Sequence, residues 1–424
     1  MEPVLDSGVS AWMLVSASLV LLMTPGLALF YGGMVRGKSV LNMMMMSFSA
    51  IAVVGVIYVL WGWSMSYGPS IGGIFGNPFD QFGLGGNFDP VSWVDEEAGT
   101  YFPTMVDVGF QATFAIITVA LISGAIADRV KFSTWIVFSA LWATLAYFPM
   151  SHMVWGGGLL SDEGPFVFGD AAPIDFAGGT VVHINAGVAA LVLALVIGKR
   201  RGFGKEPMRP HNLPFVMLGA ALLWFGWFGF NAGSAYTSGD AAGLAWVNTT
   251  TATCAAILGW LLVEKIRDGA PTSLGAASGI VAGLVAITPA AGDVSPVGSI
   301  AVGAVAGVLS AFAVGLKFKL GFDDSLDVVG IHLVAGLWGT VSLGFFAEST
   351  GLFYGGGVAQ LGVQAVIALV AIVFSVIVTV IIGYLLKAVM GWRITEQEEI
   401  DGIDFAVHGE TAYEGVGSTI SEVR

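Results

Sequence analysis

Positively charged residues occupy only alternate gaps between the long apolar stretches of this chain, and this pattern constrains the fold more than any other feature. All sixteen Lys and Arg residues lie in such gaps: Arg36, Lys38, Arg129, Lys131, Lys199, Arg200, Arg201, Lys205, Arg209, Lys265, Arg267, Lys317, Lys319, Lys387, Arg393 and Arg424. The intervening loops contain no Lys or Arg. Because basic loops resist translocation, the asymmetry predicts a multi-pass membrane protein with its basic face in the cytoplasm.

The apolar stretches are long enough to cross a bilayer. A hydrocarbon core about 30 Å thick needs roughly 20 apolar residues per helix, and 56% of this chain is hydrophobic while only 11% is charged. We predict eleven helical spans, at 10–32, 40–66, 104–126, 133–150, 177–198, 213–235, 244–263, 274–290, 296–316, 327–347 and 360–387. An all-α fold with an odd number of spans places the N-terminus outside and the C-terminus in the cytoplasm.

The sequence divides into a membrane domain, 1–390, and a cytosolic tail, 391–424. In the tail eight acids meet two cations and the apolar periodicity disappears, which by itself indicates an acidic, flexible segment. At the other end, Met1 to Ser10 contains acids but no cation. A cleaved signal peptide carries a positive N-terminal region, so we expect the first span to be retained.

Composition also excludes several classes of protein. Cys254 is the only cysteine, so an intrachain disulfide is impossible. The chain has no His-Glu-x-x-His motif and no cysteine pair, so we expect no metal, no cofactor and no enzymatic activity. Nothing indicates nucleic-acid binding. The predicted outer face carries acids without cations, which either attracts small cations or is simply a solvated surface.

Two histidines lie within apolar spans. His183 lies early in the fifth span and His332 early in the tenth, and ionisable residues at membrane depth are functional candidates. Spans five apart run in opposite directions, which fits an inverted repeat of spans one to five and six to ten, with an eleventh helix added. Such a repeat brings the two imidazoles together for proton sharing. The alternative is two separate histidines, each satisfied by neighbouring polar groups.

Aromatic and acidic side chains gather near the predicted outer face. Trp155 follows the fourth span, and Asp175 lies eight residues before His183. The third span has Phe110 and Phe114 one turn apart, and the sixth has Trp227, Phe230 and Ser234 on one face. Aromatic rings attract small cations, and a hydroxyl oxygen accepts their protons. Packing and interfacial belts are the alternative explanation.

A third polar group, 323–327, begins the tenth span at its inner end. Acids at a helix N-terminus are favoured by the helix dipole, so we expect Asp323 and Asp324 to cap the helix. Asp327, five residues before His332, is expected to tie down an inner loop.

With these residues in place, the chain resembles the ammonium transporter family (Amt/Mep/Rh), most closely its microbial Amt branch. The resemblance covers about 1–413 and rests on TPGLALFYGG (24–33), FQATF (110–114), the run 175–185, GWFGFNAGS (226–234) and the run 327–332. One departure is Leu333, where many relatives have glycine after the second histidine. The bulkier side chain alters the packing expected behind that imidazole.

The resemblance implies a homotrimer in which each protomer has its own narrow pore for ammonium or ammonia. It implies roles for the candidate residues as follows: Phe114, Trp155 and Ser234 recruit ammonium, Asp175 supports that site, Phe114 and Phe230 form a gate with Phe110 beside it, and His183 and His332 are the paired histidines of a dry lumen. Deprotonation of ammonium and passage of ammonia are the mechanism that the resemblance implies. Either ammonia moves alone or the proton follows by a separate route, and we favour the second, which moves net charge.

The tail also resembles the family's regulatory segment, and this resemblance implies that it docks under neighbouring protomers and helps the trimeric signalling protein PII to plug the inner mouths of the pores. Its matching residues are Gly391, Trp392, Arg393, Ile394, Glu396, Glu398, Glu399, Asp401, Gly402, Asp404, His408, Gly409 and Tyr413. Five cations between Lys199 and Arg209 would face such a partner or anionic membrane lipids. A plasma-membrane location follows from these expectations.

Two alternatives share the fold. A sensor would report ammonium through its tail, although sensors of this family usually carry a longer cytosolic domain than the 34 residues from Gly391 onward. An Rh-like channel would pass neutral gas, and Trp155 together with the tail argues against it. An intramembrane hydrolase would need more polar groups near the histidines than the spans contain.

Overall fold

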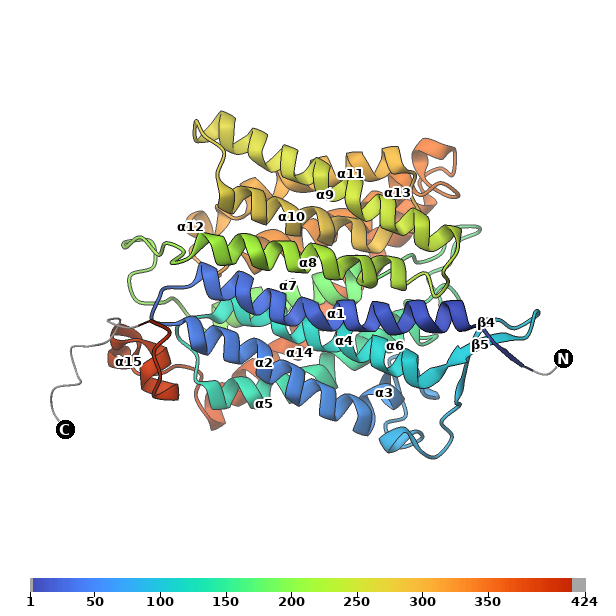
Figure 1. The fold of residues 1–424 in the computed structure, drawn as a ribbon, viewed down its shortest axis with the longest axis horizontal. Coiled ribbons are helices and arrows are strands. Elements are labelled where there is room, and N and C mark those ends of the chain that lie inside the picture. Colours follow the sequence, from blue (N-terminus) through green and yellow to red (C-terminus); the bar gives the residue numbers. More distant parts are fainter. Residues whose placement is uncertain (1–2, 414–424) are drawn as a thin grey trace.

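Eleven long apolar helices run side by side along the longest dimension of the structure (Figure 1). The computed structural model describes residues 3–413. Its spans cover Ser7–Met34, Val40–Tyr67, Thr104–Ile126, Phe132–Trp155, Gly179–Ile197, Leu213–Gly233, Asp240–Arg267, Ser273–Ala290, Pro296–Leu320, Val329–Phe346 and Ala359–Val389. The predicted eleven spans are confirmed. The fourth extends to Trp155, five residues beyond the predicted end, because its apolar helix continues across Met150.

Several spans contain more than one helical element. The simple ones are α1 (Ser7–Met34), α8 (Leu213–Gly233), α9 (Asp240–Arg267) and α14 (Ala359–Val389). The composite ones are α2 (Val40–Ile57) with α3 (Trp63–Tyr67), α5 (Phe132–Trp142) with α6 (Phe148–Trp155), and α11 (Pro296–Ala313) with α12 (Leu316–Leu320). Helices α4 (Thr104–Ser123) and α10 (Ser273–Ile287) each end in a 3-10 turn, while α7 (Asn185–Ile197) and α13 (Val334–Phe346) each follow a π-helical turn.

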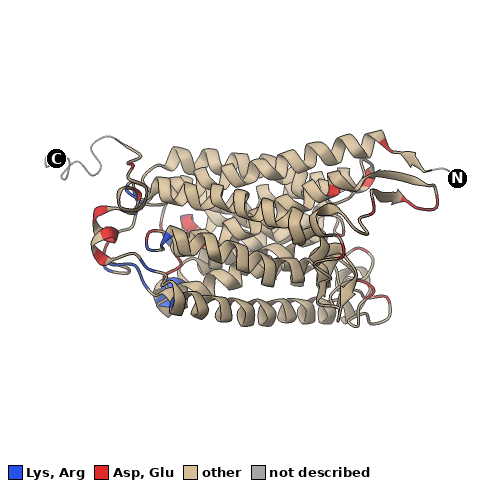
Figure 2. Cartoon of the chain, turned by 90° about the horizontal axis from the view of Figure 1, so that it is seen from below, with Lys and Arg blue, Asp and Glu red and all other residues tan. Residues whose placement is uncertain are grey.

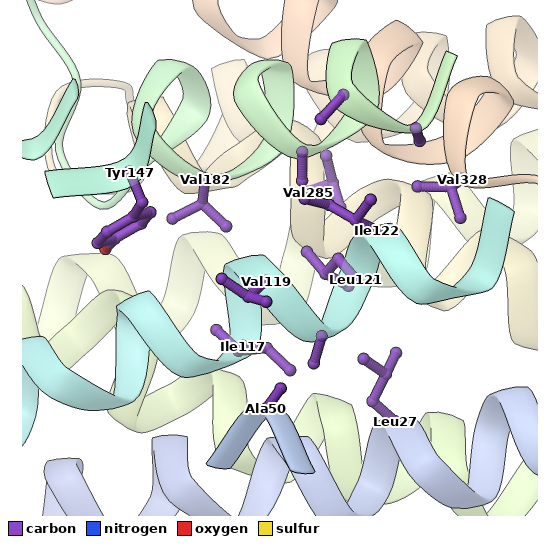
Figure 3. Close-up of a cluster of buried hydrophobic side chains, with 14 of the residues drawn as sticks. Leu27, Ala50, Ile117, Val119, Leu121, Ile122, Tyr147, Val182, Val285 and Val328 are labelled. Carbon is purple, nitrogen blue, oxygen red and sulfur yellow. The ribbon is translucent and has the colours of Figure 1, made fainter. Parts of the chain in front are cut away.

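Small residues allow these helices to pack closely. Gly303 and Gly307 of α11 lie against the backbone of Ala252 and Ala256 in α9, where an added Cβ would collide with main-chain atoms. In lipid, where no hydrophobic force drives helices together, such close approach provides the van der Waals contact that holds a bundle. At the centre, apolar side chains from several spans interdigitate (Figure 3).

Short strands are an addition to the predicted all-helical fold. β1 (Val4–Leu5) pairs in parallel with β5 (Thr100–Pro103), and β4 (Val91–Asp95) pairs antiparallel with β5. A separate hairpin joins β2 (Ser70–Ile71) to β3 (Phe75–Gly76). These strands lie at the end of the bundle where the chain begins (Figure 1). They cover that end without entering the spans.

Lys and Arg gather at the end of the bundle where the chain finishes, whereas Asp and Glu occur at both ends (Figure 2). Arg200 lies at the centre of a buried ionic cluster at the basic end. Its guanidinium contacts Asp323 at 2.8 Å and Asp128 at 3.2 Å, and Asp128 also contacts Arg36 at 3.2 Å. Asp323 therefore binds Arg200, and the expectation that it caps the tenth span is wrong.

The ionic cluster keeps its two carboxylates charged. Burial alone would raise the pKa of Asp128, but the guanidiniums of Arg200 and Arg36 lower it below 3.8. For Asp323, Arg200 and Arg129 overcome the same effect of burial and also lower the pKa below 3.8. A carboxylate whose pKa is lower in the folded protein stabilises the fold above its unfolded-state pKa. This stabilisation is present at neutral pH and is lost as the pH falls through the lowered values.

The tail from Gly391 packs against the basic end of the bundle. Trp392 is buried, its carbonyl accepts from Lys131 N at 2.8 Å, and Arg393 donates to Lys199 O at 2.6 Å. Glu399 pairs with Arg393 at 2.7 Å and accepts from Arg201 N at 2.8 Å. The prediction of a flexible acidic segment is thus wrong for residues 391–413, because its acids find cationic and backbone partners. The remainder, 414–424, lies outside the described residues.

The tail continues as a short helix and one further turn. α15 (Glu396–Asp401) begins with Thr395, whose side chain and that of Glu398 form a capping box. Asp404 then accepts from the backbone N–H groups of Leu41 and Asn42 at 3.0 and 2.8 Å, and so caps α2. The tail therefore connects loops from three different parts of the sequence.

Replacing Arg200 by Met should destabilise the protein strongly. The variant leaves Asp323 and Asp128 buried without their main partner, which costs about 3–5 kcal/mol. Thermal unfolding in detergent measures the loss. Arg267→Met is the matched control, because the pair of Arg267 with Asp268 is exposed and is worth at most about 1 kcal/mol. Equal losses in both variants would contradict the role given to the cluster.

Candidate functional site

A cavity of about 600 Å³ opens between the spans at the end opposite the cluster of Lys and Arg residues, where the strands lie (Figure 2). Its lining includes all three predicted recruitment residues, Phe114, Trp155 and Ser234, together with Asp175. These residues come from α4, α6, the C-terminal end of α8 and the loop before α7. The structure therefore brings together side chains that the sequence places far apart.

Aromatic rings close the inner end of the cavity. Phe114 stacks on Phe230 with ring centroids 4.1 Å apart and planes inclined by 25°. Trp155 meets Phe114 edge-on at 6.1 Å. Phe110 packs beside Phe114 at 4.8 Å and against Tyr236 at 5.8 Å. The paired phenylalanine rings are buried, with Phe114 lining the outer cavity and Phe230 lining a small inner one.

The hydroxyl of Ser234 is available as an acceptor. Its proton is donated to the carbonyl of Phe230 at 2.8 Å, one turn earlier on α8. The hydroxyl oxygen therefore keeps its lone pairs for a donor in the cavity. Trp155 is held by its own polar atom, since Nε1 donates to the carbonyl of Asp175 at 2.9 Å. A cation at this position would meet an aromatic face and a hydroxyl oxygen.

Asp175 acts on the backbone below the cavity. Its carboxylate accepts from the N–H groups of Gly178, Gly179 and Thr180 at 2.8, 2.5 and 2.8 Å, and also from the Thr180 hydroxyl. Burial raises the pKa of this carboxyl, and the hydrogen bonds from Thr180, Gly179 and Gly178 oppose that rise. With its oxygens occupied in this way, Asp175 positions the start of the fifth span and the indole of Trp155.

The start of the fifth span requires glycine. Gly178 adopts φ +120, a conformation that other residues rarely adopt. It turns the chain from the Asp175 loop into the π-helical turn Gly179–Ile184, which carries His183. The wide turn shifts the register of the side chains relative to an α-helix, and such turns recur at functional sites.

His183 and His332 meet at the centre of the bundle. Their Nδ1 atoms lie 3.3 Å apart and their rings are stacked, with centroids 5.4 Å apart. Both residues are buried, and His183 Nε2 has no hydrogen-bond partner in the described chain. Trp227 stacks on His183 at 5.5 Å and Phe230 at 6.2 Å. The alternative of two separate histidines is wrong, because the rings form one pair.

The space beside the histidines is narrow and apolar. The cavity there has a volume of about 10 Å³, roughly that needed by one water molecule. Its lining is apolar apart from the imidazoles and the indole of Trp227: Met23, Leu27, Phe30, Ile117, Leu121, Val182, His183, Leu223, Trp227, Phe230, Val281 and His332. Nearby members of this layer, Leu27, Leu121 and Val182, are visible in Figure 3.

Asp324 repeats at the tenth span what Asp175 does at the fifth. It lies eight residues before His332, accepts from Val328 N at 3.1 Å and from Val329 N at 2.7 Å, and precedes the π-helical turn Val329–Leu333. Burial raises the pKa of Asp324 to about 6, and Lys317 limits the rise. The two halves thus match as an inverted repeat requires. Asp175 and Asp324 each lie eight residues before a histidine. This equal spacing could have identified Asp324 as a site residue from the sequence, but the prediction did not include it.

Asp327 adopts φ +64 and pairs with Lys317 at 2.7 Å. The ion pair connects the start of the tenth span to α12. Asp327 was expected to hold an inner loop in place at this position. Asp327 lies neither in the outer cavity nor beside the histidines. Within the described residues, no group of three or more His, Cys, Asp or Glu side chains is arranged to hold a metal ion.

Leu333 is accommodated by a glycine on the facing span. A Cβ at Gly187 would lie 2.7 Å from the Leu333 Cβ, so the absence of a side chain there makes room for the leucine. In the other half, a Cβ at Gly336 would lie 2.9 Å from the His183 Cβ. Each glycine is four residues after a histidine. Ile184 follows His183 as Leu333 follows His332. Both halves therefore hold a bulky residue directly after the histidine.

The model of the Ammonium Transporter Family matches residues 11–413 of this chain. The chain belongs to the ammonium transporter family. An ammonium transporter of Mycobacterium tuberculosis is 57% identical and is matched over 96% of this chain and 91% of its own length. An ammonium transporter of Bacillus subtilis is 46% identical, over 97% and 99%. The family is one of transporters and not of enzymes.

Solved structures share the fold. A sensor Amt protein superposes with a TM-score of 0.84 at 29% identity, covering 94% of this chain and 98% of its own. Mep2 of Candida albicans gives a TM-score of 0.82 at 32% identity, covering 93% and 88%. The family member described here is therefore a multi-pass helical membrane protein whose architecture is shared with the sensor Amt protein and with fungal Mep2.

Replacing Asp175 by Ala should loosen the start of the fifth span. Several buried N–H groups lose their acceptor, and the cost is on the order of 3 kcal/mol. Thermal unfolding reports the loss, and tryptophan fluorescence reports the change around Trp155. Asp162→Ala is the control, since Asp162 lines the same cavity but is exposed. An unchanged unfolding temperature for Asp175→Ala would contradict its positioning role.

Proposed function

We propose that this protein transports ammonium across the plasma membrane. The observation that carries the proposal is the column of stacked rings, Phe114, Phe230, His183 and His332, which runs from the outer cavity to the centre of the bundle. Ammonium binds at the outer end of the column, against Phe114, Trp155 and Ser234. It loses a proton on entering, and ammonia passes through the narrow lumen while the proton moves separately.

Selectivity follows from the chemistry of the two cavities. Ammonium and potassium carry the same charge, but ammonium has four N–H donors and can lose a proton. A bare ion in an apolar medium is very costly, and the inner cavity offers potassium too few oxygen ligands to replace its water. Ammonia is neutral and can exchange hydrogen bonds with an imidazole. The pore therefore favours the species that can become neutral.

The histidine pair has a defined polarity in this mechanism. Only one proton fits between the two Nδ1 atoms at 3.3 Å, so one neutral ring donates through Nδ1 while the other accepts there. The donating ring then has an acceptor at Nε2, and the accepting ring has a donor at Nε2. The pair can therefore accept from and donate to ammonia on its two sides. The unpartnered Nε2 of His183 supports this assignment.

The charge distribution supports an orientation with the N-terminus outside. Cations gather at the end that bears the tail (Figure 2), and the positive end of a multi-pass protein is cytoplasmic. The wide cavity with its acidic rim then faces outward, where a small cation is captured. The domain boundary near residue 390 follows, since α14 ends at Val389 and the docked tail begins.

A sensor is the second candidate. The solved sensor Amt protein shares the fold, and the tail of this chain is tied to loops beneath three spans, so it would respond to movements of those spans. A channel for neutral gas is a third candidate. The three candidates differ in whether charge crosses the membrane.

Reconstituted protein should give a transient current after an ammonium jump and none after an equal potassium jump. Solid-supported membranes are the measurement. In the double variant His183→Ala/His332→Ala the lumen loses its imidazoles, so we expect at least a ten-fold loss of ammonium current or a gain of potassium current. Asp162→Asn serves as a variant outside the column, with current within about two-fold of the unmodified protein.

Other outcomes select the other candidates. An internal pH rise in vesicles without current would indicate a neutral-gas channel. Neither signal from correctly folded protein would favour the sensor.

We also propose that three copies assemble and that the docked tail helps a PII signalling protein bind. Apolar residues such as Leu258 and Leu262 are exposed along α9, and would contact lipid or another copy. On the tail, Ile400 and Phe405 are exposed, and Ile400 lines a pocket together with Arg36, Lys38 and Arg201. That surface presents both charged and apolar groups to a cytosolic partner.

Light scattering of the purified protein should give three copies of the 44.0 kDa chain after correction for detergent. A purified PII protein from the same organism should bind this trimer, and Phe405→Glu should weaken binding at least ten-fold by placing a charge in the contact. A mass of a single copy would contradict the trimer. Equal binding by the variant would contradict the proposed surface.

A further inference from the structure

A second polar cluster, separate from Phe114, Trp155 and Ser234, lines the outer cavity. Asp107, Gln111 and Tyr236 all face the cavity. The Tyr236 hydroxyl donates to Asp107 Oδ1 at 2.8 Å, and Gln111 Nε2 donates to the same hydroxyl at 2.6 Å. The three side chains thus form one chain of hydrogen bonds ending on a carboxylate.

The direction of this chain leaves acceptors free. Tyr236 has one proton, and because that proton goes to Asp107, the hydroxyl must accept from the amino group of Gln111. The amide oxygen of Gln111 is thereby turned away from Tyr236. It is buried with no partner in the described residues, and the whole residue is only 6% exposed. A buried acceptor without a donor is costly, which points to a donor that the protein does not itself provide.

The cluster lies directly outside the predicted recruitment site. Asp107 and Gln111 are one turn apart on α4, and Phe114 follows Asp107 by two turns, about 10 Å along the helix. Tyr236 lies two residues after Ser234, and its ring packs on Phe110 at 5.8 Å. Tyr67, whose hydroxyl also lacks a partner among the described residues, lines the same cavity. A cation leaving the cluster inward reaches Phe114 next.

We propose that Asp107 and Gln111 bind ammonium at a waiting position before it reaches Phe114, Trp155 and Ser234, an inference that rests on the proposed transport function. Two N–H groups of the ion donate to the free oxygen of Asp107 and to Gln111 Oε1. Tyr236 holds both acceptors in place. One carboxylate neutralises one unit of charge, which suits a monovalent cation. Two or three acceptors suit a tetrahedral donor better than potassium, which needs more oxygen ligands.

The test is the dependence of current on ammonium concentration in reconstituted protein. Asp107→Asn removes the charge, while its amide oxygen can still accept from Tyr236. We expect the half-saturating concentration to rise about ten-fold or more, because a charge-assisted hydrogen bond is lost, with the maximal current within about two-fold. Gln111→Met, which removes the amide oxygen, should raise the half-saturating ammonium concentration at least three-fold. Asp107→Glu keeps the charge and should retain most of the affinity for ammonium.

Asp162→Asn is the matched control, since it removes a carboxylate from the rim of the same cavity. Screening by salt limits such a field effect, so its shift should stay below about two-fold. An equal shift in the control would overturn the proposal, leaving only general attraction by the acidic rim. A lower maximal current and unfolding temperature with unchanged half-saturation would also overturn it, leaving a structural role.

A binding measurement separates this inference from the proposed function. Ammonium should raise the unfolding temperature of the unmodified protein, and the rise should be smaller in Asp107→Asn. If the unmodified protein carried no current but this difference remained, transport would fail and the binding position would stand. If transport occurred but neither Asp107→Asn nor Gln111→Met changed affinity, only the binding position would fail.

Discussion

Two carboxylates supply hydrogen bonds that the membrane interior cannot. Asp175 and Asp324 each accept from backbone N–H groups at the start of a span, where the first turn of a helix has no internal partners. Without them these N–H groups would be buried unpaired at a cost of several kcal/mol. With them, each segment can enter the bundle as a π-helical turn that carries a histidine. The meeting of His183 and His332 depends on this pair of caps.

The crossing of the two turns also explains why glycine is needed beside them. Gly187 and Gly336 each lie one turn after a histidine and face the opposite span at distances that admit no Cβ. The close approach brings the imidazoles into contact and leaves a cavity of only about 10 Å³. The bulky side chain of Leu333 is compatible with this geometry because Gly187 on the opposite span leaves room for it. The room does not come from the space behind the imidazole of His332.

Much of this arrangement was predictable from the sequence. Apolar length together with the alternation of basic loops predicted the number of spans, because each span must cross the hydrocarbon layer, and the position of His183 and His332 in spans five apart predicted their contact. The sequence did not show that Asp323 would bind Arg200, because that choice depends on loops 123 residues apart. Nor did composition show that the tail docks, since the partners of Glu399 and Asp404 lie in distant loops. Short-range patterns specify helices, but long-range ionic contacts depend on the finished packing.

The contrast between the two cavities gives the proposed mechanism its physical basis. About 600 Å³ of polar space lies outside the rings of Phe114 and Phe230, and about 10 Å³ of apolar space lies beyond them. An ion that crosses from one to the other loses its ligands, and the cost of an unpaired charge in such a medium exceeds what any single contact returns. Ammonium can avoid that cost by giving up its proton, which under the proposed function crosses separately, whereas potassium has no proton to give up. Under the proposed function, ammonium must bind outside the rings and also be released inward. Several weak hydrogen-bond acceptors in series allow both steps, whereas a single very tight site would retain the ion.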